Sequence, residues 1–208
     1  MQEGKGSFFN RSLSRVAELS IAENKPADAL IYYKQFLGVA KNKKEQFIAL
    51  AGLMDAFYLQ QQYDSSSYYA NMILEREGIP ADIENKAALY KGKLEMAQGN
   101  FEAAIDQFVT TLNGAKDVNG AEAQYLLAEI LHKQAKYRES LEKCFELNKI
   151  FAAYSLWYDK SFLLIADNYI ALKEDYQATY TLEKIIDKSP NPATVEAARV
   201  KLSKLKGQ

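Results

Sequence analysis

The sequence has little of the material from which most catalytic and metal sites are built. It contains one cysteine, Cys144, and one histidine, His132, among 208 residues. A single cysteine excludes an internal disulfide and any multi-cysteine metal centre. The histidine stands alone, without the paired spacing of a zinc site. We therefore expect no catalytic residues, no metal and no cofactor, and we expect that the protein is not an enzyme.

Charge and hydropathy exclude two further classes of partner. The 26 basic and 27 acidic residues leave a formal net charge of −1, so no overall field attracts nucleic acid or an anionic membrane surface. No window of about 18 uncharged apolar residues is available to span a membrane. Selection of a partner must therefore depend on local groups of side chains. Cys144 falls at an inward helical position and is interpreted as a small core residue, not as a nucleophile.

Helix breakers are also scarce, because the chain has only four prolines and ten glycines. Helix is favoured nearly throughout. Five segments superimpose, and in each a small or slim residue on a first helix is followed twelve positions later by a small residue on a second helix. The pairs are Ala17 and Ala29, Met54 and Ser66, Gly92 and Ala104, Ala128 and Ser140, and Ala166 and Ala178. Antiparallel helices approach closely only where neither carries a bulky side chain, so this spacing predicts five helical hairpins.

The hairpins repeat with a period of 36 to 38 residues. The run from Gly92 through Gly99, Phe101 and Ala104 to Phe108 resembles the tetratricopeptide pattern closely. Residues 120–130 and 160–169 resemble the carboxy-terminal repeats of large tetratricopeptide proteins of the bacterial cell envelope. The resemblance implies an all-α fold, a right-handed α-solenoid of about five hairpins followed by a C-terminal capping helix.

The expected organisation is a single solenoid domain over residues 8–208, after a flexible tail or expression remnant at residues 1–7. The expected repeats cover approximately residues 10–44, 47–81, 85–118, 121–155 and 159–190. A helix over residues 194–206, with one apolar stripe and one charged face, is expected to cap the array. Phe8 and Phe9 leave the amino-terminal edge open, which predicts a segment of a longer protein with further repeats before it.

The resemblance implies a non-catalytic scaffold or adaptor that binds a protein or peptide on its inner face, which first helices line. Carried over residue by residue, the expected ligand-binding set is Tyr58, Lys86, Lys93, Tyr125, Glu129, His132, Lys160 and Asp167. The rings offer large contact area at low entropy cost, and the charged groups offer pairing with a ligand. The alternative interpretation is that these charges pair only with neighbours in the chain.

Two other functions stay open at this point. One is a structural or oligomerising module that packs end to end with further repeats, and the other is a regulatory segment of an enzyme complex. The resemblance favours the periplasm or cell envelope of a bacterium, although the cytoplasm is not excluded. Trp157 is expected to be a packing wedge between the fourth and fifth repeats, because large aromatic side chains are mostly buried.

Overall fold

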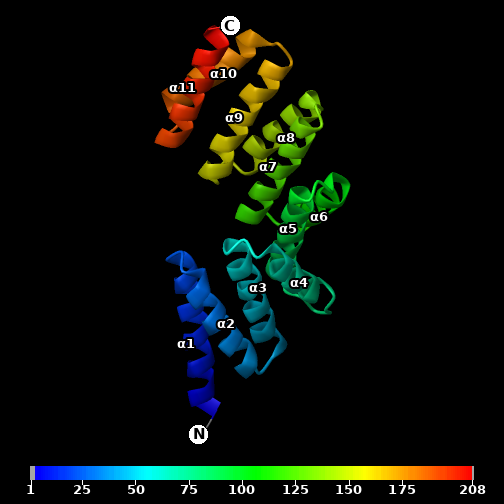
Figure 1. Cartoon of the computed structure of the whole chain (residues 1–208), viewed down its shortest axis with the longest axis vertical. Coiled ribbons are helices and arrows are strands. Elements are labelled where there is room, and N and C mark those ends of the chain that lie inside the picture. The colour runs from blue at the N-terminus through cyan, green and yellow to red at the C-terminus, as the bar shows by residue number, and fades with distance from the viewer. Residues whose placement is uncertain (1–2, 208) are drawn as a thin grey trace. The chain divides into compact units, whose positions relative to one another are not determined.

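The structure is a computed structural model that describes residues 3–207, with side chains described from Phe8 to Gly207. Every regular element within residues 3–207 is a helix, and eleven α-helices follow one another through short turns (Figure 1). The all-α class predicted from the helix periodicity is confirmed. Internal contacts divide the chain into two compact units, with the boundary between Gly114 and Ala115. The expectation of one domain over residues 8–208 stays a prediction.

Unit 1 holds three helical hairpins. They are formed by α1 (Glu3–Ala22) with α2 (Pro26–Val39), α3 (Lys43–Leu59) with α4 (Tyr63–Leu74), and α5 (Ala81–Ala97) with α6 (Phe101–Gly114). Helix α1 begins at Glu3, so residues 3–7 are helical where a flexible tail was expected, because the helix of the first repeat continues toward the amino terminus. The rest of that expected tail, residues 1 and 2, lies outside the described residues.

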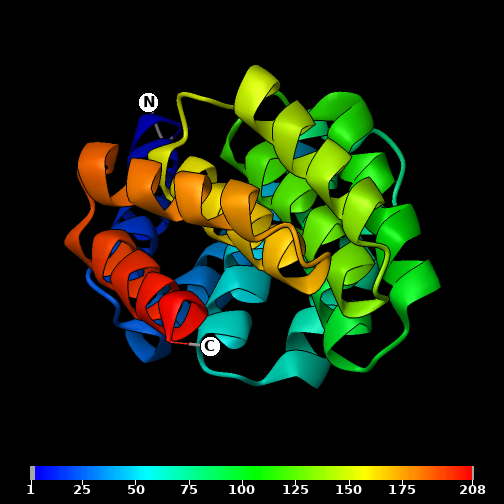
Figure 2. The same cartoon turned by 90° about the horizontal axis from the view of Figure 1, so that it is seen from above.

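Unit 2 holds two hairpins and a last helix. The hairpins are α7 (Val118–Lys133) with α8 (Tyr137–Ile150) and α9 (Ser155–Ala171) with α10 (Asp175–Lys188), and the last helix is α11 (Pro192–Lys206). Helix α11 starts after Asn191, whose side chain accepts a hydrogen bond from the Ala193 amide, and it lies along α10 (Figure 2). Ala198 of α11 joins the buried cluster of Ala166, Leu182 and Ile185. The expected cap therefore covers the second hairpin of this unit.

The small residues twelve positions apart are where each hairpin closes. All ten are buried. A Cβ atom on Gly92 would lie 2.5 Å from the Phe108 ring, which shows how little space is available. Met54, the poorest fit to the pattern, keeps its own side chain fully buried, while the Ser66 hydroxyl donates a hydrogen bond to the Met54 carbonyl at 3.0 Å. Close backbone approach thus explains the spacing.

The turn inside each hairpin repeats one backbone conformation. The residue seven positions after the first small residue has a positive φ in all five hairpins. These residues are Asn24, Gln61, Gly99, Ala135 and Lys173. In the fourth turn the Ala135 amide donates to the His132 carbonyl at 2.9 Å and the Lys136 amide donates to the Leu131 carbonyl at 2.9 Å. This pair of bonds is the Schellman motif, which satisfies the last carbonyls of the first helix.

First helices in the interior of a unit are buried on two sides. One side of α3 packs on the preceding hairpin, through Ala49, Leu53 and Ala56. The other side packs against α4 and α5, through Phe47 and Leu50 among others. Within the part of the chain that the structure describes, no helix is both long enough and apolar enough to cross a bilayer. The apolar residues of these helices serve packing between neighbouring hairpins.

Candidate functional site

In unit 1, a lysine lies over two tyrosine rings contributed by neighbouring first helices. The Lys93 Nζ atom on α5 is 4.4 Å from the ring centroid of Tyr58 on α3 and 4.8 Å from that of Tyr90 on α5. The two rings meet edge to face with centroids 4.8 Å apart. A lysine cation over tyrosine faces is attracted by the ring quadrupoles. The result is a half-buried group of two rings and one cation that spans two repeats.

An ion pair lies beside these rings. Lys86 on α5 pairs with Asp55 on α3, and the carboxylate is largely buried. Burial raises the pKa of Asp55, and the neighbouring Lys86 cation acts in the opposite direction. The Tyr90 side chain also lowers the pKa of this carboxyl, by less than Lys86 does. Desolvation of Asp55 is therefore only partly offset by its pairing with Lys86.

Unit 2 contains a second lysine over two rings. The Lys160 Nζ atom on α9 is 4.5 Å from the ring centroid of Trp157 and 5.7 Å from that of Tyr125 on α7. The two rings lie 5.5 Å apart. Trp157 is only 8% exposed, so the packing role predicted for it agrees with its burial. Burial, with the nearby Glu129 carboxylate, raises the pKa of Tyr125 and keeps its hydroxyl protonated.

The acidic residues of this unit are paired within the chain. Asp167 on α9 accepts a hydrogen bond from Lys201 on α11 at 2.6 Å, and both side chains are about one-third exposed. Glu129 on α7 pairs with Lys133 one turn further along at 3.1 Å. These pairs leave each carboxylate one cationic neighbour and partial access to solvent. Surface pairs of this kind each contribute little to stability, so a ligand cation can compete for the carboxylates.

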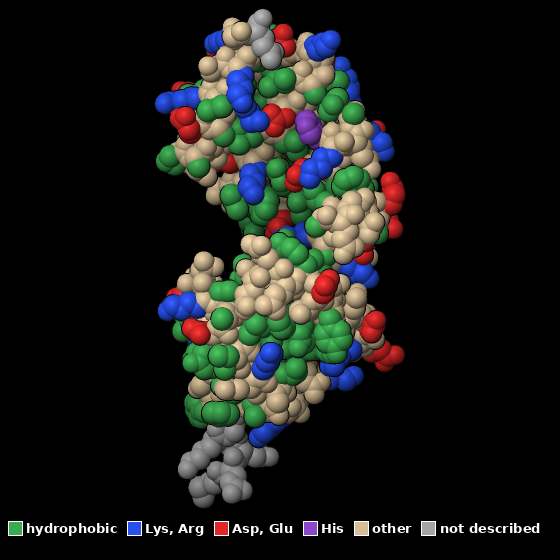
Figure 3. Space-filling view, viewed as in Figure 1, with side chains coloured by type: hydrophobic (Ala, Val, Ile, Leu, Met, Phe, Trp, Pro, Cys, Tyr) green, Lys and Arg blue, Asp and Glu red, His purple; other side chains and the backbone are tan. Residues whose placement is uncertain are grey.

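His132 begins a chain of hydrogen bonds that leads into the core. Its Nδ1 atom is 2.7 Å from the Oδ1 atom of Asn168. The Asn168 amide donates to the Ser140 hydroxyl at 2.8 Å, and that hydroxyl donates to the Ala128 carbonyl at 2.8 Å. With Asn168 in this orientation, Nδ1 must carry a proton, so a neutral His132 presents Nε2 as an acceptor. Figure 3 shows the histidine at the surface among basic, acidic and hydrophobic side chains.

The structure places all eight expected ligand-binding residues on first helices, but in two separate sets. Unit 1 brings together Tyr58, Lys86 and Lys93. Unit 2 brings together Tyr125, Glu129, His132, Lys160 and Asp167. Whether any of them binds a ligand stays a prediction, and most of their charges already have partners in the chain.

Sequence reasoning missed three members of these groups. Tyr90 lies two residues before Gly92, outside the positions expected to face the groove, and the structure places its ring against that of Tyr58 on α3. Trp157 was predicted to serve packing between repeats, and the structure also places the Lys160 ammonium over its ring. Lys201 lies on the last helix, which was expected only to cap the array, and α11 contacts α9 closely enough for Lys201 to pair with Asp167.

A separate hollow of about 210 Å³ lies in unit 2 between the start of α9 and the end of α10. Tyr158 and Phe162, whose ring centroids are 5.0 Å apart, form its apolar wall, and Lys184 and Lys188 also line it. No sequence pattern pointed to it, because it is formed by the ends of two helices.

Cys144 is fully buried, and burial raises the pKa of its thiol to about 12. No group of three or more metal-ligand side chains occurs within the described range.

Comparison with solved structures identifies the fold. The chain resembles YrrB, described as a TPR protein with an unusual peptide-binding site, with a TM-score of 0.61, 16% identity, and coverage of 91% of this chain and 90% of that one. It also resembles TTC0263, a thermophilic TPR protein of Thermus thermophilus, with a TM-score of 0.63, 11% identity, and coverage of 96% and 100%. No protein-family model matches the sequence, and no curated protein matches it either. The resemblance inferred from the hairpin pattern is thus confirmed at the level of the fold.

Proposed function

Because the chain has the fold of tetratricopeptide-repeat proteins, we propose that it is a non-catalytic scaffold that binds a protein or peptide through its first helices. The observation that carries the proposal is the pair of lysine-over-aromatic groups: Lys93 over Tyr58 and Tyr90, and Lys160 over Tyr125 and Trp157. Each places a lysine cation beside half-buried tyrosine rings, which are Tyr58 and Tyr90 in unit 1 and Tyr125 in unit 2. Such surfaces bind with little loss of side-chain entropy.

The chemistry of the two groups defines the ligand that suits them. An acidic side chain of the peptide would pair with the lysine ammonium, while the neighbouring side chain of the peptide packs on the aromatic rings. The accepting Nε2 atom of His132 suits an amide or hydroxyl donor of the same ligand. We therefore propose a segment in which acidic residues stand beside aliphatic or aromatic ones. The resemblance to YrrB, whose description names a peptide-binding site, supports this class of ligand.

The test is selection of peptides from a random phage-displayed library on the full chain. Enriched sequences should place Asp or Glu beside an apolar residue. Synthetic versions of these peptides should then bind more weakly to Tyr125→Ala/Lys160→Glu or to Tyr58→Ala/Lys93→Glu, by about tenfold or more if a main contact is lost. Trp157 is the single tryptophan and lies under Lys160, so its fluorescence reports binding in unit 2 directly.

A matched control is available on a second helix. The Lys184 Nζ atom lies 5.4 Å from the centroid of the exposed Tyr180 ring, so α10 carries a lysine-over-tyrosine pair of similar chemistry. The Tyr180→Ala/Lys184→Glu variant should leave peptide binding unchanged. If this variant weakens binding as much as the first-helix variants do, the first helices are not the binding surface.

The remaining expectations are part of the same proposal. A scaffold of this kind needs no catalytic residue, and the high pKa and burial of Cys144 argue against a thiol nucleophile. The bacterial periplasm or cell envelope stays the compartment suggested by the resemblance of residues 120–130 and 160–169. Fractionation of cells that produce the native protein would test it, and recovery with cytosolic markers alone would contradict it.

A further inference from the structure

The hollow between α9 and α10 of unit 2 has an aromatic wall and a basic wall. Tyr158 and Phe162 lie one turn apart on α9, and their half-buried rings meet edge to face. Lys184 and Lys188 lie one turn apart on α10, and both residues are exposed. The hollow has a volume of about 210 Å³. A cavity of about 150 Å³ can hold benzene, so this one has room for a single ring with a short chain.

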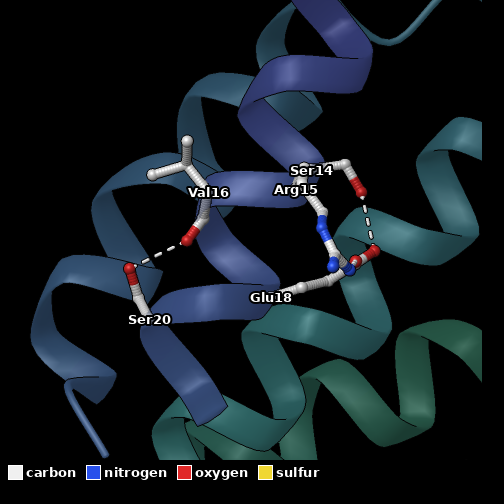
Figure 4. A network of polar contacts seen from close by, with 5 residues as sticks. All are labelled: Ser14, Arg15, Val16, Glu18 and Ser20. Carbon is white, nitrogen blue, oxygen red and sulfur yellow. Dashed lines mark hydrogen bonds and ion pairs between the residues drawn. The ribbon is translucent and has the colours of Figure 1, made fainter. Parts of the chain in front are cut away.

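The two lysines of the hollow differ from most cations of the chain. Arg15 on α1, for example, pairs with Glu18 on the same helix, and Ser14 donates a hydrogen bond to the same carboxylate (Figure 4). Among the residues that the structure describes, neither Lys184 nor Lys188 forms an ion pair. The basic wall therefore offers two ammonium groups to an external anion.

Asp159 also lines the hollow, and its charge does not cancel that of the lysines. The residue is 8% exposed, and its carboxylate accepts a hydrogen bond from the Ser189 hydroxyl at 2.8 Å. One buried carboxylate thus stands against two exposed ammonium groups. The hollow has a surplus of positive charge on its exposed side, which favours an anionic ligand.

The fourth hairpin shows which group suits this end of a hairpin. Phe151 follows α8 at the position that Ser189 has after α10, one repeat further along. The Phe151 residue is 2% exposed, and its ring lies so close to Gly120 that a Cβ atom there would be 3.0 Å away. Gly120 corresponds in turn to Tyr158. The fourth hairpin thus closes this end with a ring of its own chain, whereas the fifth has a serine there and keeps a hollow.

We propose that the hollow binds a small aromatic carboxylate, which consists of a single ring with an acidic group on a short chain. The ring packs on Tyr158 and Phe162, as the Phe151 ring packs within the fourth hairpin. The carboxylate pairs with Lys184 and Lys188 at the exposed side. An apolar wall with a few convergent polar groups is the usual character of a small-molecule site. The site shares no residue with the lysine-over-aromatic groups.

The size of the hollow favours a free acid over a segment of a partner chain. Peptides bind along a sheet edge, in a groove as long as a helix, or in an aromatic groove that takes several residues. The hollow is confined to the start of α9 and the end of α10, and it holds one ring. We therefore assign it to a free acid, and binding of a peptide there is an outcome that the test can reveal.

The probe for the experiment is phenylacetate, titrated into the full chain and followed by the NMR chemical shifts of the isotope-labelled protein. We expect saturable binding with a Kd of about 1 mM or below, as suits a ligand of this size. Phenylacetamide has the same shape without the charge, and acetate has the charge without the ring. Both should bind at least about tenfold more weakly.

Protein variants assign the binding to the hollow. Ser189→Phe adds the ring that Phe151 supplies in the fourth hairpin, so it should fill the hollow and weaken binding at least about tenfold. Lys188→Glu replaces an attraction by a repulsion and should weaken binding about threefold to tenfold. The matched controls are Ser203→Phe and Lys204→Glu, which make the same changes at exposed positions of α11 and should bind like the wild type. Circular dichroism checks that each variant is folded.

Three results would overturn the proposal. The first is the absence of saturable binding up to about 10 mM, and the second is binding that neither Ser189→Phe nor Lys188→Glu weakens. The third is a loss of binding of the library-selected peptides in Ser189→Phe, which would assign the hollow to a peptide. The Tyr125→Ala/Lys160→Glu variant should bind phenylacetate like the wild type, so failure of this proposal and failure of the proposed function are distinguished.

Discussion

The hydroxyl of Ser140 on α8 donates a hydrogen bond to the main-chain carbonyl of Ala128 on α7, at 2.8 Å. Ser66 makes the corresponding bond to the Met54 carbonyl at 3.0 Å. The other three hairpins have alanine at this second-helix position. A serine here keeps the crossing narrow and satisfies its own hydroxyl on the neighbouring backbone, so the small-residue position accepts a buried polar group.

The two serines should respond differently to replacement by alanine. Ser66→Ala removes one buried hydrogen bond and should cost about 0.5–1.5 kcal/mol. Ser140→Ala also removes the acceptor of the Asn168 amide, so it should cost more, about 1–3 kcal/mol. Urea unfolding of both variants measures the difference. Equal losses would show that the Asn168 amide finds another partner.

Exchanging alanine and glycine at the positive-φ position of the hairpin turns should change the free energy of unfolding. Ala135 has φ of 58°, a conformation that an L-residue with a Cβ atom adopts at a cost of about 1–2 kcal/mol. Ala135→Gly removes this strain but adds chain entropy to the unfolded state, so we expect a net gain of up to about 1 kcal/mol. Gly99, with φ of 82°, occupies the same position in the third hairpin. Gly99→Ala should lose a similar amount, and thermal melts of both variants should move in opposite directions.

Two helical glycines should also respond with opposite signs. Gly92→Ala places a Cβ atom 2.5 Å from the Phe108 ring, and such overpacking costs about 1–3 kcal/mol. Gly38→Ala meets no atom within 4 Å and should instead stabilise α2 by up to about 1 kcal/mol. Combining Gly92→Ala with Phe108→Leu should recover part of the loss, since the smaller side chain can move. A loss that the double variant does not reduce would place the strain elsewhere.

The pH dependence of stability should identify Asp55 as a destabilising charge. Its pKa is raised above 3.8 by burial, so folding disfavours the ionised form, and the free energy of unfolding falls as pH rises through this pKa. Asp55→Asn should therefore be more stable than the wild type at pH 7, and the two should converge below about pH 4. Thermal melts across this pH range provide the measurement.

Glu146 provides a control of opposite sign. The pKa of this carboxyl is lowered, chiefly by its hydrogen bond with Lys143. The ionised form therefore stabilises the folded state when the pH is above the pKa of the unfolded chain. This stabilisation is lost as the pH falls through the lowered pKa of the folded state. Glu146→Gln should be slightly less stable than the wild type at pH 7 and equal to it in acid. If Asp55→Asn and Glu146→Gln shift stability in the same direction, the assignment of Asp55 is wrong.

The sequence by itself determined the hairpins and their number. Pairs such as Gly92 and Ala104 report close backbone approach between two helices that adjoin in the chain, and that approach leaves a local and regular signal. The turn conformation did not leave such a signal, because only Gly99 among the five positive-φ residues is a glycine. Backbone hydrogen bonds of the turn impose the conformation whatever the side chain.

Tertiary structure alone decided which side chains meet across repeats. Lys201 pairs with Asp167, 34 positions away in the chain, and Tyr90 joins Tyr58 and Lys93, because neighbouring first helices are set side by side by packing of the apolar faces between them. That packing depends on how each second helix covers the next first helix, which no single segment encodes. For the same reason, only the tertiary structure shows that Val16 is exposed while Leu53, at the same position of the next repeat, is buried.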